Sequence, residues 1–182
     1  MVVIFGLMAT GKTTLARALG QALGWPVVES DQVRKGLAGM KPTSRATVAF
    51  GHGIYAADFS ARTYGEMRRQ AAAHLTAGSS VILDGSYKRA TERALVRQLA
   101  REHQAAALSV YCECPLAEAR RRAGIRLTDP QAISDGRVDL FEAQINDFDP
   151  LGPEDRPLLR LNTDRRIAVV LEELKGFVQD YL

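Results

Sequence analysis

Gly6-Leu7-Met8-Ala9-Thr10-Gly11-Lys12-Thr13 is the stretch of sequence that decides the fold. It matches the pattern Gly-x-x-x-x-Gly-Lys-Ser/Thr of a phosphate-binding P-loop. The apolar run Val2–Phe5 precedes it, and a helical pattern with Leu15 and Leu19 on one face follows it. A glycine-rich turn that binds nothing is the alternative, and the agreement of strand, loop and helix disfavours it.

The chemistry of phosphate binding explains the spacing of this loop. Glycines let the backbone wrap so that successive N–H groups point at one anion, and the following helix adds the positive end of its dipole. We expect Lys12 to reach the β- and γ-phosphates of ATP or GTP as a catalytic group, and the Thr13 hydroxyl to bind Mg²⁺. The expected nucleotide-binding residues are Gly6, Met8, Ala9, Thr10, Gly11, Lys12, Thr13 and Thr14.

The composition is that of an ordinary soluble globular protein. Of the 182 residues, 46% are hydrophobic and 25% are charged. The net charge of +3 and the pI of about 9.0 suit anionic ligands such as nucleotides. Nucleic acid is a possible partner but is not favoured, because the basic residues lie in short clusters that helices routinely expose to solvent. Cys112 and Cys114, the only cysteines, share a predicted strand and are expected to be reduced packing residues.

The amino-terminal apolar run lacks the basic leader of a secretion signal and leads directly into the loop. No apolar run in the sequence approaches the length that spans a membrane. We therefore expect a cytoplasmic protein without a membrane partner.

Short apolar runs alternate with longer helical patterns along the chain. This alternation predicts parallel strands with helices on both faces of the sheet. The predicted strands are Val2–Phe5, Trp25–Ser30, Ser80–Leu83, Ala106–Cys112 and Leu158–Leu161, and the predicted helices include Val33–Met40 and Val138–Phe148. The sequence shows no internal repeat or linker, so we expect residues 1–182 to form a single domain.

Two polar stretches interrupt this alternation. Residues 41–53 are polar, rich in small residues and without helical or strand period, which is more typical of a functional segment than of an idle loop. We expect a substrate cap at about residues 36–60. The polar span at residues 127–137 follows an arginine-rich helix, and we expect a lid at about residues 120–137.

Two carboxylates stand at the carboxyl ends of predicted strands, the edge at which open α/β sheets bind their ligands. Asp84 is expected to hold Mg²⁺ or its water beside the substrate, with a helix cap as the alternative. Asp31 is expected to take the proton from a hydroxyl that attacks the γ-phosphate, while Arg34 orients that acceptor. For this second pair the alternative is an N-cap aspartate with a solvated arginine.

The acceptor side has two further candidates. Tyr87, with Lys88 and Arg89, follows Asp84 and is expected to face the acceptor pocket, although basic residues entering a helix are common. For His52, substrate contact and a surface loop stay open as alternatives.

Arginines form the third candidate group. Phosphoryl transfer spreads negative charge over equatorial oxygens, and arginines that close over the nucleotide neutralise it and exclude water. Arg122 and Arg126 are four residues apart and share a helical face, so we expect both to be catalytic and Arg120 to contact the nucleotide. Arg121 falls off that face. An exposed basic helix is the alternative for the whole run.

Taken together, these residues resemble the P-loop kinase superfamily, which includes gluconate, shikimate and nucleoside monophosphate kinases, chloramphenicol phosphotransferase and the kinase domain of polynucleotide kinase. In particular, the chain is similar to the ATP-binding kinase-like domains found beside, or fused to, aminoglycoside-phosphotransferase-like domains. The resemblance covers nearly the full length. The matching pieces are residues 6–14, residues 30–35, Ile54-Tyr55, Arg62-Thr63-Tyr64, residues 81–87, Arg122 with Arg126, Ser134-Asp135 and Gln144.

The resemblance implies a fold and several residue roles. The fold is the P-loop NTPase three-layer sandwich, an α/β fold with a five-stranded parallel sheet in the order 2-3-1-4-5. By the same resemblance, Asp31 and Arg34 activate and hold the acceptor, and Tyr55 belongs to the substrate side. The arginine pair described above acts from the lid, and the turn at Asn162 contacts the nucleotide base.

On this resemblance we expect an ATP- or GTP-dependent kinase that transfers the γ-phosphoryl group to a hydroxyl of a small molecule or nucleotide, as a monomer or homodimer. Met8 and Ala9 replace the residues usual in the loop, and Gly85-Ser86 stands where relatives usually have alanine and threonine, so the acceptor stays open. A polynucleotide 5′-hydroxyl kinase is one alternative and requires a basic channel. A nucleotide-binding regulatory module without its own acceptor, coupled to a partner phosphotransferase, is another.

Overall fold

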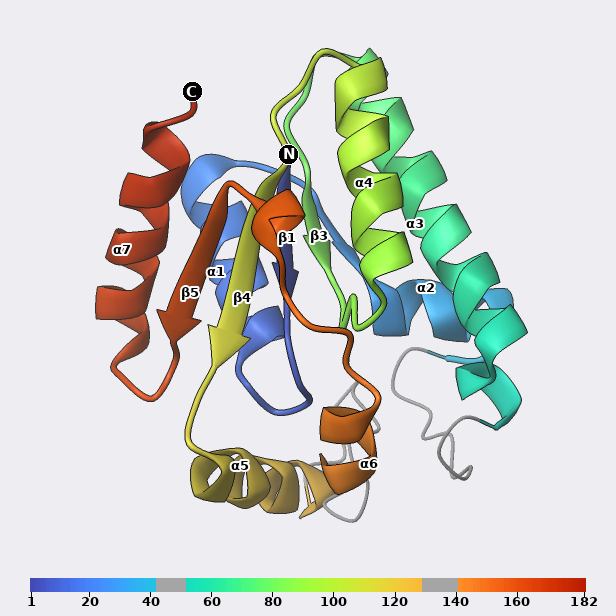
Figure 1. The fold of residues 1–182 in the computed structure, drawn as a ribbon, viewed down its shortest axis with the longest axis vertical. Helices are drawn as coiled ribbons and strands as arrows, with labels where there is room; N and C mark the ends of the chain where they lie inside the picture. Colours follow the sequence, from blue (N-terminus) through green and yellow to red (C-terminus); the bar gives the residue numbers. More distant parts are fainter. Residues whose placement is uncertain (42–51, 129–140) are drawn as a thin grey trace.

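Five parallel strands form one sheet in the computed structural model, which describes residues 1–41, 52–128 and 141–182. Their order across the sheet is β2-β3-β1-β4-β5, which confirms the predicted order (Figure 1). The strands are β1 (Val2–Phe5), β2 (Val27–Glu29), β3 (Ile82–Asp84), β4 (Leu108–Glu113) and β5 (Leu158–Asn162). The strand that leads into the P-loop therefore lies at the centre of the sheet.

Helices cover both faces of the sheet, with α1 and α7 on one face and α3 and α4 on the other (Figure 1). The α-helices are α1 (Lys12–Leu23), α2 (Ser30–Leu37), α3 (Ala57–Thr76), α4 (Ala90–Glu102), α5 (Leu116–Thr128), α6 (Phe141–Asn146) and α7 (Ile167–Gln179). Short 3₁₀ turns lie at Gly53–Tyr55 and Pro153–Asp155. This three-layer arrangement confirms the predicted fold class.

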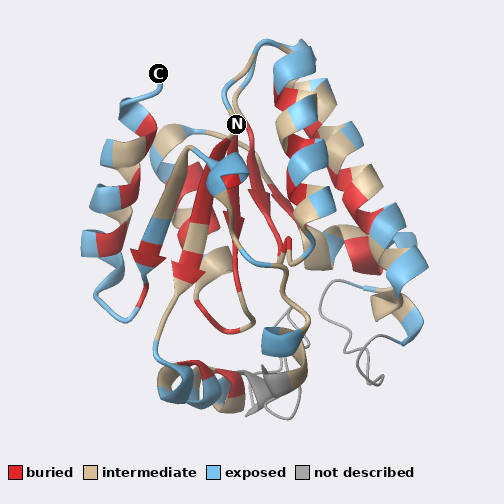
Figure 2. Ribbon diagram, viewed as in Figure 1, coloured by how far each residue is buried: buried red, intermediate tan, exposed pale blue. Residues whose placement is uncertain are grey.

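The central strand supplies the core of both layers. Val2 and Ile4 pack in the cluster that contains α1 and α7, whereas Val3 and Phe5 pack in the cluster that contains α3 and α4. Successive residues of a strand point to opposite faces, so a strand covered on both sides has to be apolar throughout. All four side chains are buried, and Figure 2 shows β1 and β3 in red, whereas the edge strand β5 is mostly intermediate or exposed.

The loops that bear the candidate residues meet at the carboxyl edge of this sheet. Ile4 of β1 and Glu29 of β2 both pair with Asp84 of β3, so the segments that follow these residues are neighbours. They are the P-loop, the first turn of α2 and residues 85–89. Helices α5 and α6 lie beyond the same edge (Figure 1).

Several element boundaries differ from the prediction by a few residues. Helix α2 begins at Ser30, earlier than the expected Val33, and β2 ends at Glu29. Serine and aspartate favour helix starts over strands, which explains the shift and puts Asp31 in the first turn of α2. Helix α6 spans Phe141–Asn146 and ends two residues before the expected Phe148, while the start of the expected helix, residues 138–140, lies outside the described residues.

Parts of the predicted cap and lid lie outside the described residues, namely residues 42–51 and 129–140. Cys112 is buried in β4, Cys114 follows it, and both are free thiols. Across the three described segments, no helix combines the length and apolar character required to cross a membrane.

Candidate functional site

The P-loop links β1 to α1 through backbone conformations that few side chains allow. Gly6 has a φ of 141°, and a Cβ atom there would lie 2.4 Å from the carbonyl oxygen of Cys112. Gly11, immediately before α1, has a φ of 82°, and Ala9 has a φ of 57°. These positive φ values turn the loop tightly against β4, as the wrapping of an anion by backbone N–H groups requires.

Lys12 lies across this loop. Its Nζ donates a hydrogen bond to the carbonyl oxygen of Leu7 at 2.5 Å, and the Thr10 hydroxyl donates to the same oxygen at 2.8 Å. The lysine side chain thus bridges from the start of α1 back to the beginning of the loop. From this position its ammonium would meet a phosphate group bound by the loop amides.

Asp84 is the buried carboxylate beside the loop. Its side chain is almost fully buried at 4% exposure, and its Oδ2 accepts a hydrogen bond of 2.6 Å from the Thr13 hydroxyl. Burial raises the pKa of Asp84 to about 6, while the nearby Lys12 ammonium and the Thr13 hydrogen bond oppose that rise. The second carboxylate oxygen, Oδ1, is buried without a hydrogen-bond partner.

These two residues fit a magnesium site. A hydroxyl and a carboxylate are the hard oxygen ligands that Mg²⁺ takes together with water and phosphate oxygens. A buried carboxylate oxygen without a partner is costly, and a cation or a water bound to it would remove that cost. The structure therefore brings together Lys12, Thr13 and Asp84, which the sequence placed in one phosphate and metal site.

Arg34 is buried on α2, beyond the carboxyl end of β2. Its Nη1 donates to the carbonyl oxygen of Ile54 at 2.5 Å and to the Ser60 hydroxyl at 3.1 Å, and its guanidinium lies 4.9 Å from the centre of the Tyr55 ring. Its Nε is buried without a hydrogen-bond partner. Asp31 lies nearly one turn earlier on α2 and is partly exposed. Arg34 thus links the segment around Tyr55 to α2, and its Nε–H is available to donate a hydrogen bond to a ligand.

Tyr87 lies in the core, whereas the sequence predicts that it faces the acceptor pocket. Its side chain is fully buried, with its ring 4.8 Å from the ring of Tyr64 of α3 and its hydroxyl unpartnered. The backbone N–H of Tyr87 donates to the Tyr64 hydroxyl at 3.2 Å, and that hydroxyl also contacts the Ser86 hydroxyl at 2.9 Å. Tyr87 therefore lies in the core behind the P-loop and does not face an acceptor pocket.

Arg122 approaches the P-loop from α5. It donates to Glu118 at 2.6 Å and to the carbonyl oxygen of Thr163 at 3.0 Å, and its Nη1 lies 3.6 Å from the position of a Cβ atom on Gly11. The Thr163 hydroxyl in turn donates to the carbonyl oxygen of Thr10 at 2.8 Å. Arg122 and the turn after β5 thus lie against the end of the loop that leads into α1.

Two of the other residues predicted to contact the nucleotide, Arg120 and Asn162, are exposed. Arg120 is exposed on α5, and Arg126 belongs to the last turn of the same helix, with its side chain outside the described part. Arg121 is exposed and pairs with Glu118. Asn162 is exposed at the end of β5, where its Oδ1 accepts the N–H of Asp164 at 2.8 Å.

Gln144 of α6 is a site residue whose role the sequence did not reveal. Its Oε1 accepts a hydrogen bond of 2.6 Å from the backbone N–H of Met8 in the P-loop. The residues are 136 positions apart, so no local pattern connects them. Gln144 was visible in the sequence only as one piece of the family resemblance.

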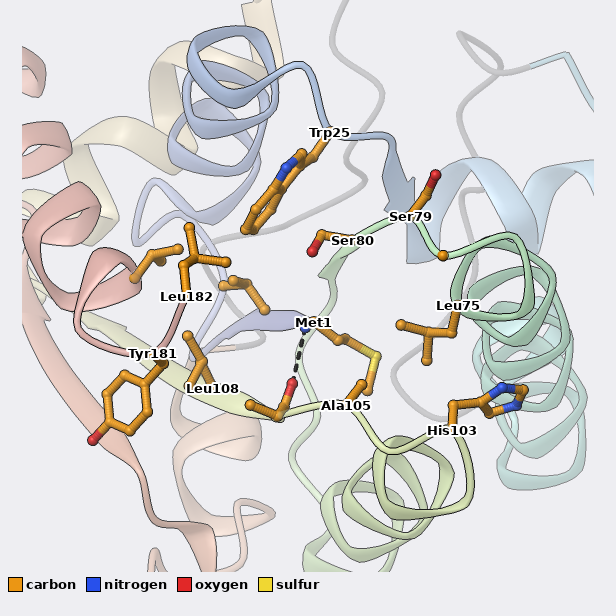
Figure 3. Close-up of a pocket in the computed structure, with 14 residues that line it drawn as sticks. Met1, Trp25, Leu75, Ser79, Ser80, His103, Ala105, Leu108, Tyr181 and Leu182 are labelled. Atoms are coloured by element: carbon orange, nitrogen blue, oxygen red, sulfur yellow. Dashed lines mark hydrogen bonds between the residues drawn. The ribbon is translucent and has the colours of Figure 1, made fainter.

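A cavity of about 260 Å³ lies at the opposite edge of the sheet. Met1, Trp25, Leu75, His103 and Tyr181 are among the residues that line it (Figure 3). It adjoins the amino ends of β1 and β4, whereas ligands of open α/β sheets bind at the carboxyl ends. The cavity is therefore separate from the P-loop site.

A family model and a curated relative match the chain. The model of the AAA_33 family, described as an AAA domain, matches residues 1–151. A curated relative, the protein Rv2004c of Mycobacterium tuberculosis, is 31% identical over 112 residues, which are 62% of this chain and 22% of the relative. The matched region thus spans about a fifth of the length of that relative.

Solved structures of kinases share the fold over almost the whole chain. A putative kinase from Chloroflexus aurantiacus has a TM-score of 0.73 at 19% identity and covers 100% of this chain and 96% of its own. A gluconokinase from Sinorhizobium meliloti has a TM-score of 0.69 at 16% identity, with 99% and 92% covered. The M. tuberculosis APS kinase CysC, in complex with AMPPNP and APS, has a TM-score of 0.68 at 21% identity, with 98% and 96% covered. The chain belongs to the AAA_33 family and has the fold of the P-loop kinases.

Proposed function

We propose that the protein is an ATP- or GTP-dependent kinase that transfers the γ-phosphoryl group to a hydroxyl of a small molecule or nucleotide. The observation that carries this proposal is the contact between Thr13 and Asp84 beside a lysine that lies across the P-loop. A hydroxyl, a buried carboxylate and an ammonium in this arrangement fit a metal–triphosphate complex.

Each residue has a defined part in the transfer. The loop amides and Lys12 bind the triphosphate, and Thr13 with Asp84 would hold Mg²⁺, which would supply positive charge to neutralise the phosphates. The acceptor oxygen forms a bond to the γ-phosphorus while the bond to the β–γ bridging oxygen breaks. Asp31 accepts the hydroxyl proton, the nucleoside diphosphate leaves, and Arg122 neutralises charge that develops next to the loop.

The remaining roles belong to the same proposal. Arg34, with Tyr55, shapes the acceptor side, and Arg126 acts with Arg122 from the lid. We assign the acceptor cap to residues 36–60 and the lid to residues 120–137 of a single domain. Arg120 and Asn162 lie on the side of the nucleotide, and the free cysteines suit a reducing cytoplasm.

Two observations support a small acceptor. The related folds include a gluconokinase and an APS kinase, which are named for small-molecule substrates. On the described surface, Arg68, Arg69, Lys88 and Arg89 are paired with carboxylates, which removes much of the positive charge that a nucleic-acid channel requires.

Phosphoryl transfer to a panel of sugars, aminoglycosides, nucleosides and 5′-hydroxyl oligonucleotides tests this function, with mass spectrometry as the readout. The wild-type protein is expected to phosphorylate a small acceptor with ATP or GTP. Asp31→Asn is expected to lower the transfer rate about 100-fold or more because the proton acceptor is lost, while nucleotide binding persists. Gln32→Ala changes the next, exposed residue and serves as the matched control.

The outcomes separate the alternatives. Nucleotide binding without any phosphorylated product would favour a regulatory module that depends on a partner phosphotransferase. Exclusive phosphorylation of oligonucleotides, with steep weakening of binding as salt rises, would favour a polynucleotide kinase. Full transfer activity in Asp31→Asn would contradict the assigned proton acceptor.

A further inference from the structure

A side chain from α6 engages the P-loop directly. The Oε1 of Gln144 accepts the backbone N–H of Met8 at 2.6 Å. Backbone N–H groups of a P-loop are the donors that a phosphate uses, so Gln144 holds a donor that belongs to the phosphate cradle. The carboxamide oxygen therefore occupies a backbone donor that a phosphate oxygen would otherwise use.

The chain around Gln144 is fastened to the segment that follows Asp84. Asp147 pairs with Lys88 at 2.5 Å and also with Arg89. Asp149 accepts the N–H of Ala90 at 2.8 Å and donates its own N–H to the carbonyl oxygen of Lys88 at 2.9 Å. These contacts fix the end of α6, so the position of Gln144 at the loop is part of the fold.

The two ends of the P-loop face different sides of the site. The Gly11 end adjoins Arg122 and Thr163 at the end of β5, the side to which the proposed function assigns the base. At the other end, the N–H of Gly6 donates to the carbonyl oxygen of Ser86 at 3.4 Å, on the side of the proposed acceptor. A triphosphate that runs between these sides directs its terminal phosphoryl group toward the Met8 end.

We propose that Gln144 recognises the terminal phosphoryl group of the nucleotide. This inference rests on the proposed function, because it assumes that the loop binds a triphosphate. In the ligand-free protein, the carboxamide oxygen occupies the donor of Met8. When the triphosphate enters, a γ-phosphate oxygen takes the Met8 N–H, and the carboxamide turns so that Nε2 donates to the same phosphate.

The chemistry of the amide group makes this exchange possible. A carboxamide carries an acceptor oxygen and two N–H donors on one planar group, so a half-turn replaces one by the other without moving α6. After phosphoryl transfer, the diphosphate product lacks the terminal group, and the carboxamide returns to Met8. Gln144 therefore favours the triphosphate over the diphosphate product.

Calorimetric titration with Mg²⁺·AMPPNP and Mg²⁺·ADP tests the inference on the wild-type protein and two variants. Gln144→Ala removes both the acceptor and the donors, and we expect about a tenfold loss of AMPPNP affinity with ADP affinity within about twofold. Gln144→Glu keeps the acceptor for Met8 but places a negative charge beside the phosphate, so the AMPPNP loss is expected to be larger. Asn146→Ala changes an exposed residue of the same helix and is the control.

A spectroscopic measurement tests the contact itself. The chain has four methionines, so labelling with ¹⁵N-methionine gives a short amide spectrum in which a Met8→Leu variant assigns the Met8 signal. Without ligand, the Met8 signal is expected to shift in Gln144→Ala and to stay in place in Asn146→Ala. In the wild-type protein, AMPPNP is expected to move it further than ADP does.

The outcomes distinguish this inference from the proposed function. If the wild-type protein binds neither nucleotide, both are overturned. If it binds both nucleotides and the ratio of their affinities is the same in all variants, the role of Gln144 is overturned and the proposed function stands.

Discussion

The fold buries the Asp84 carboxylate almost completely, and the ionised form of this side chain lowers the free energy of unfolding. Burial raises its pKa from 3.8 to about 6, so the folded protein binds this proton more tightly than the unfolded chain does. The stability that this proton contributes is therefore fully present below pH about 4 and is lost as the pH rises through about 6. In the absence of Mg²⁺, the ionised Asp84 destabilises the fold at neutral pH.

Asp84→Asn is expected to stabilise the protein at neutral pH. Asparagine keeps an oxygen for the Thr13 hydroxyl without the buried charge, so the gain in the free energy of unfolding should grow from pH 4 to pH 7 and reach about 3 kcal/mol. Urea unfolding of both proteins across this range, without metal, measures the difference. A gain that does not change with pH would contradict the account, and added Mg²⁺ should favour the wild-type protein.

The sequence predicts the contacts of some site residues but not of others. The spacing of the P-loop placed Thr13, and the apolar run before Asp84 placed that carboxylate at a strand end, so their meeting could be predicted from parallel-strand geometry. The burial of Arg34 could not be predicted in this way, because Arg34 is buried by contacts with Ile54 and Ser60, which lie 20 and 26 residues later in the chain. Contacts that tertiary packing creates leave no periodic signal.

At the scale of elements, Arg93 of α4 joins three parts of the chain. Its Nε donates to the fully buried Asp155 at 2.9 Å, and its other nitrogens donate to the carbonyl oxygens of Tyr87 at 3.0 Å and Pro150 at 2.8 Å. The guanidinium thus ties α4 to the segment after Asp84 and to the segment after α6. These are the segments that position Gln144.

Arg93→Met is expected to lower the free energy of unfolding by about 3–5 kcal/mol, because Asp155 loses a buried partner and two carbonyl groups lose their donor. Arg97 also pairs with Asp155 but is less buried, at 15% exposure, and its Nη1 makes one contact of 2.6 Å. Arg97→Met therefore serves as the comparison and should cost about 1 kcal/mol. Urea unfolding measures both, and equal losses would contradict the dominant role of Arg93.

The sheet could be predicted better than the short helices. Strands covered on both faces must be apolar, and this pattern is local to each strand. Helix α6 has only six residues and gains its place from contacts of Asp147 and Asp149 with Lys88 and Arg89. A helix held by distant ion pairs carries little information about its own carboxyl end, which is why the predicted end at Phe148 was too late.

At the scale of the whole molecule, the strand order divides the site into two sides. Because β1 is central, the P-loop lies between the ends of β4 and β5 and the ends of β3 and β2. Arg122 and Thr163 adjoin the first side, whereas Asp84 and Asp31 belong to the second. A nucleotide on one side and an acceptor on the other then meet at the loop, as the proposed transfer requires.

Calorimetric titration of the protein with Mg²⁺·AMPPNP, repeated on Lys12→Ala and on the control Lys175→Ala, tests the central claim most directly. The account predicts one binding site per chain in the wild-type protein and in Lys175→Ala, whose lysine is remote on α7 and pairs with Glu172. Lys12→Ala should bind at least about tenfold more weakly, because the phosphates lose their ammonium partner. The absence of any binding heat in the wild-type protein, or equal affinity in Lys12→Ala, would contradict the claim that this loop holds a nucleoside triphosphate.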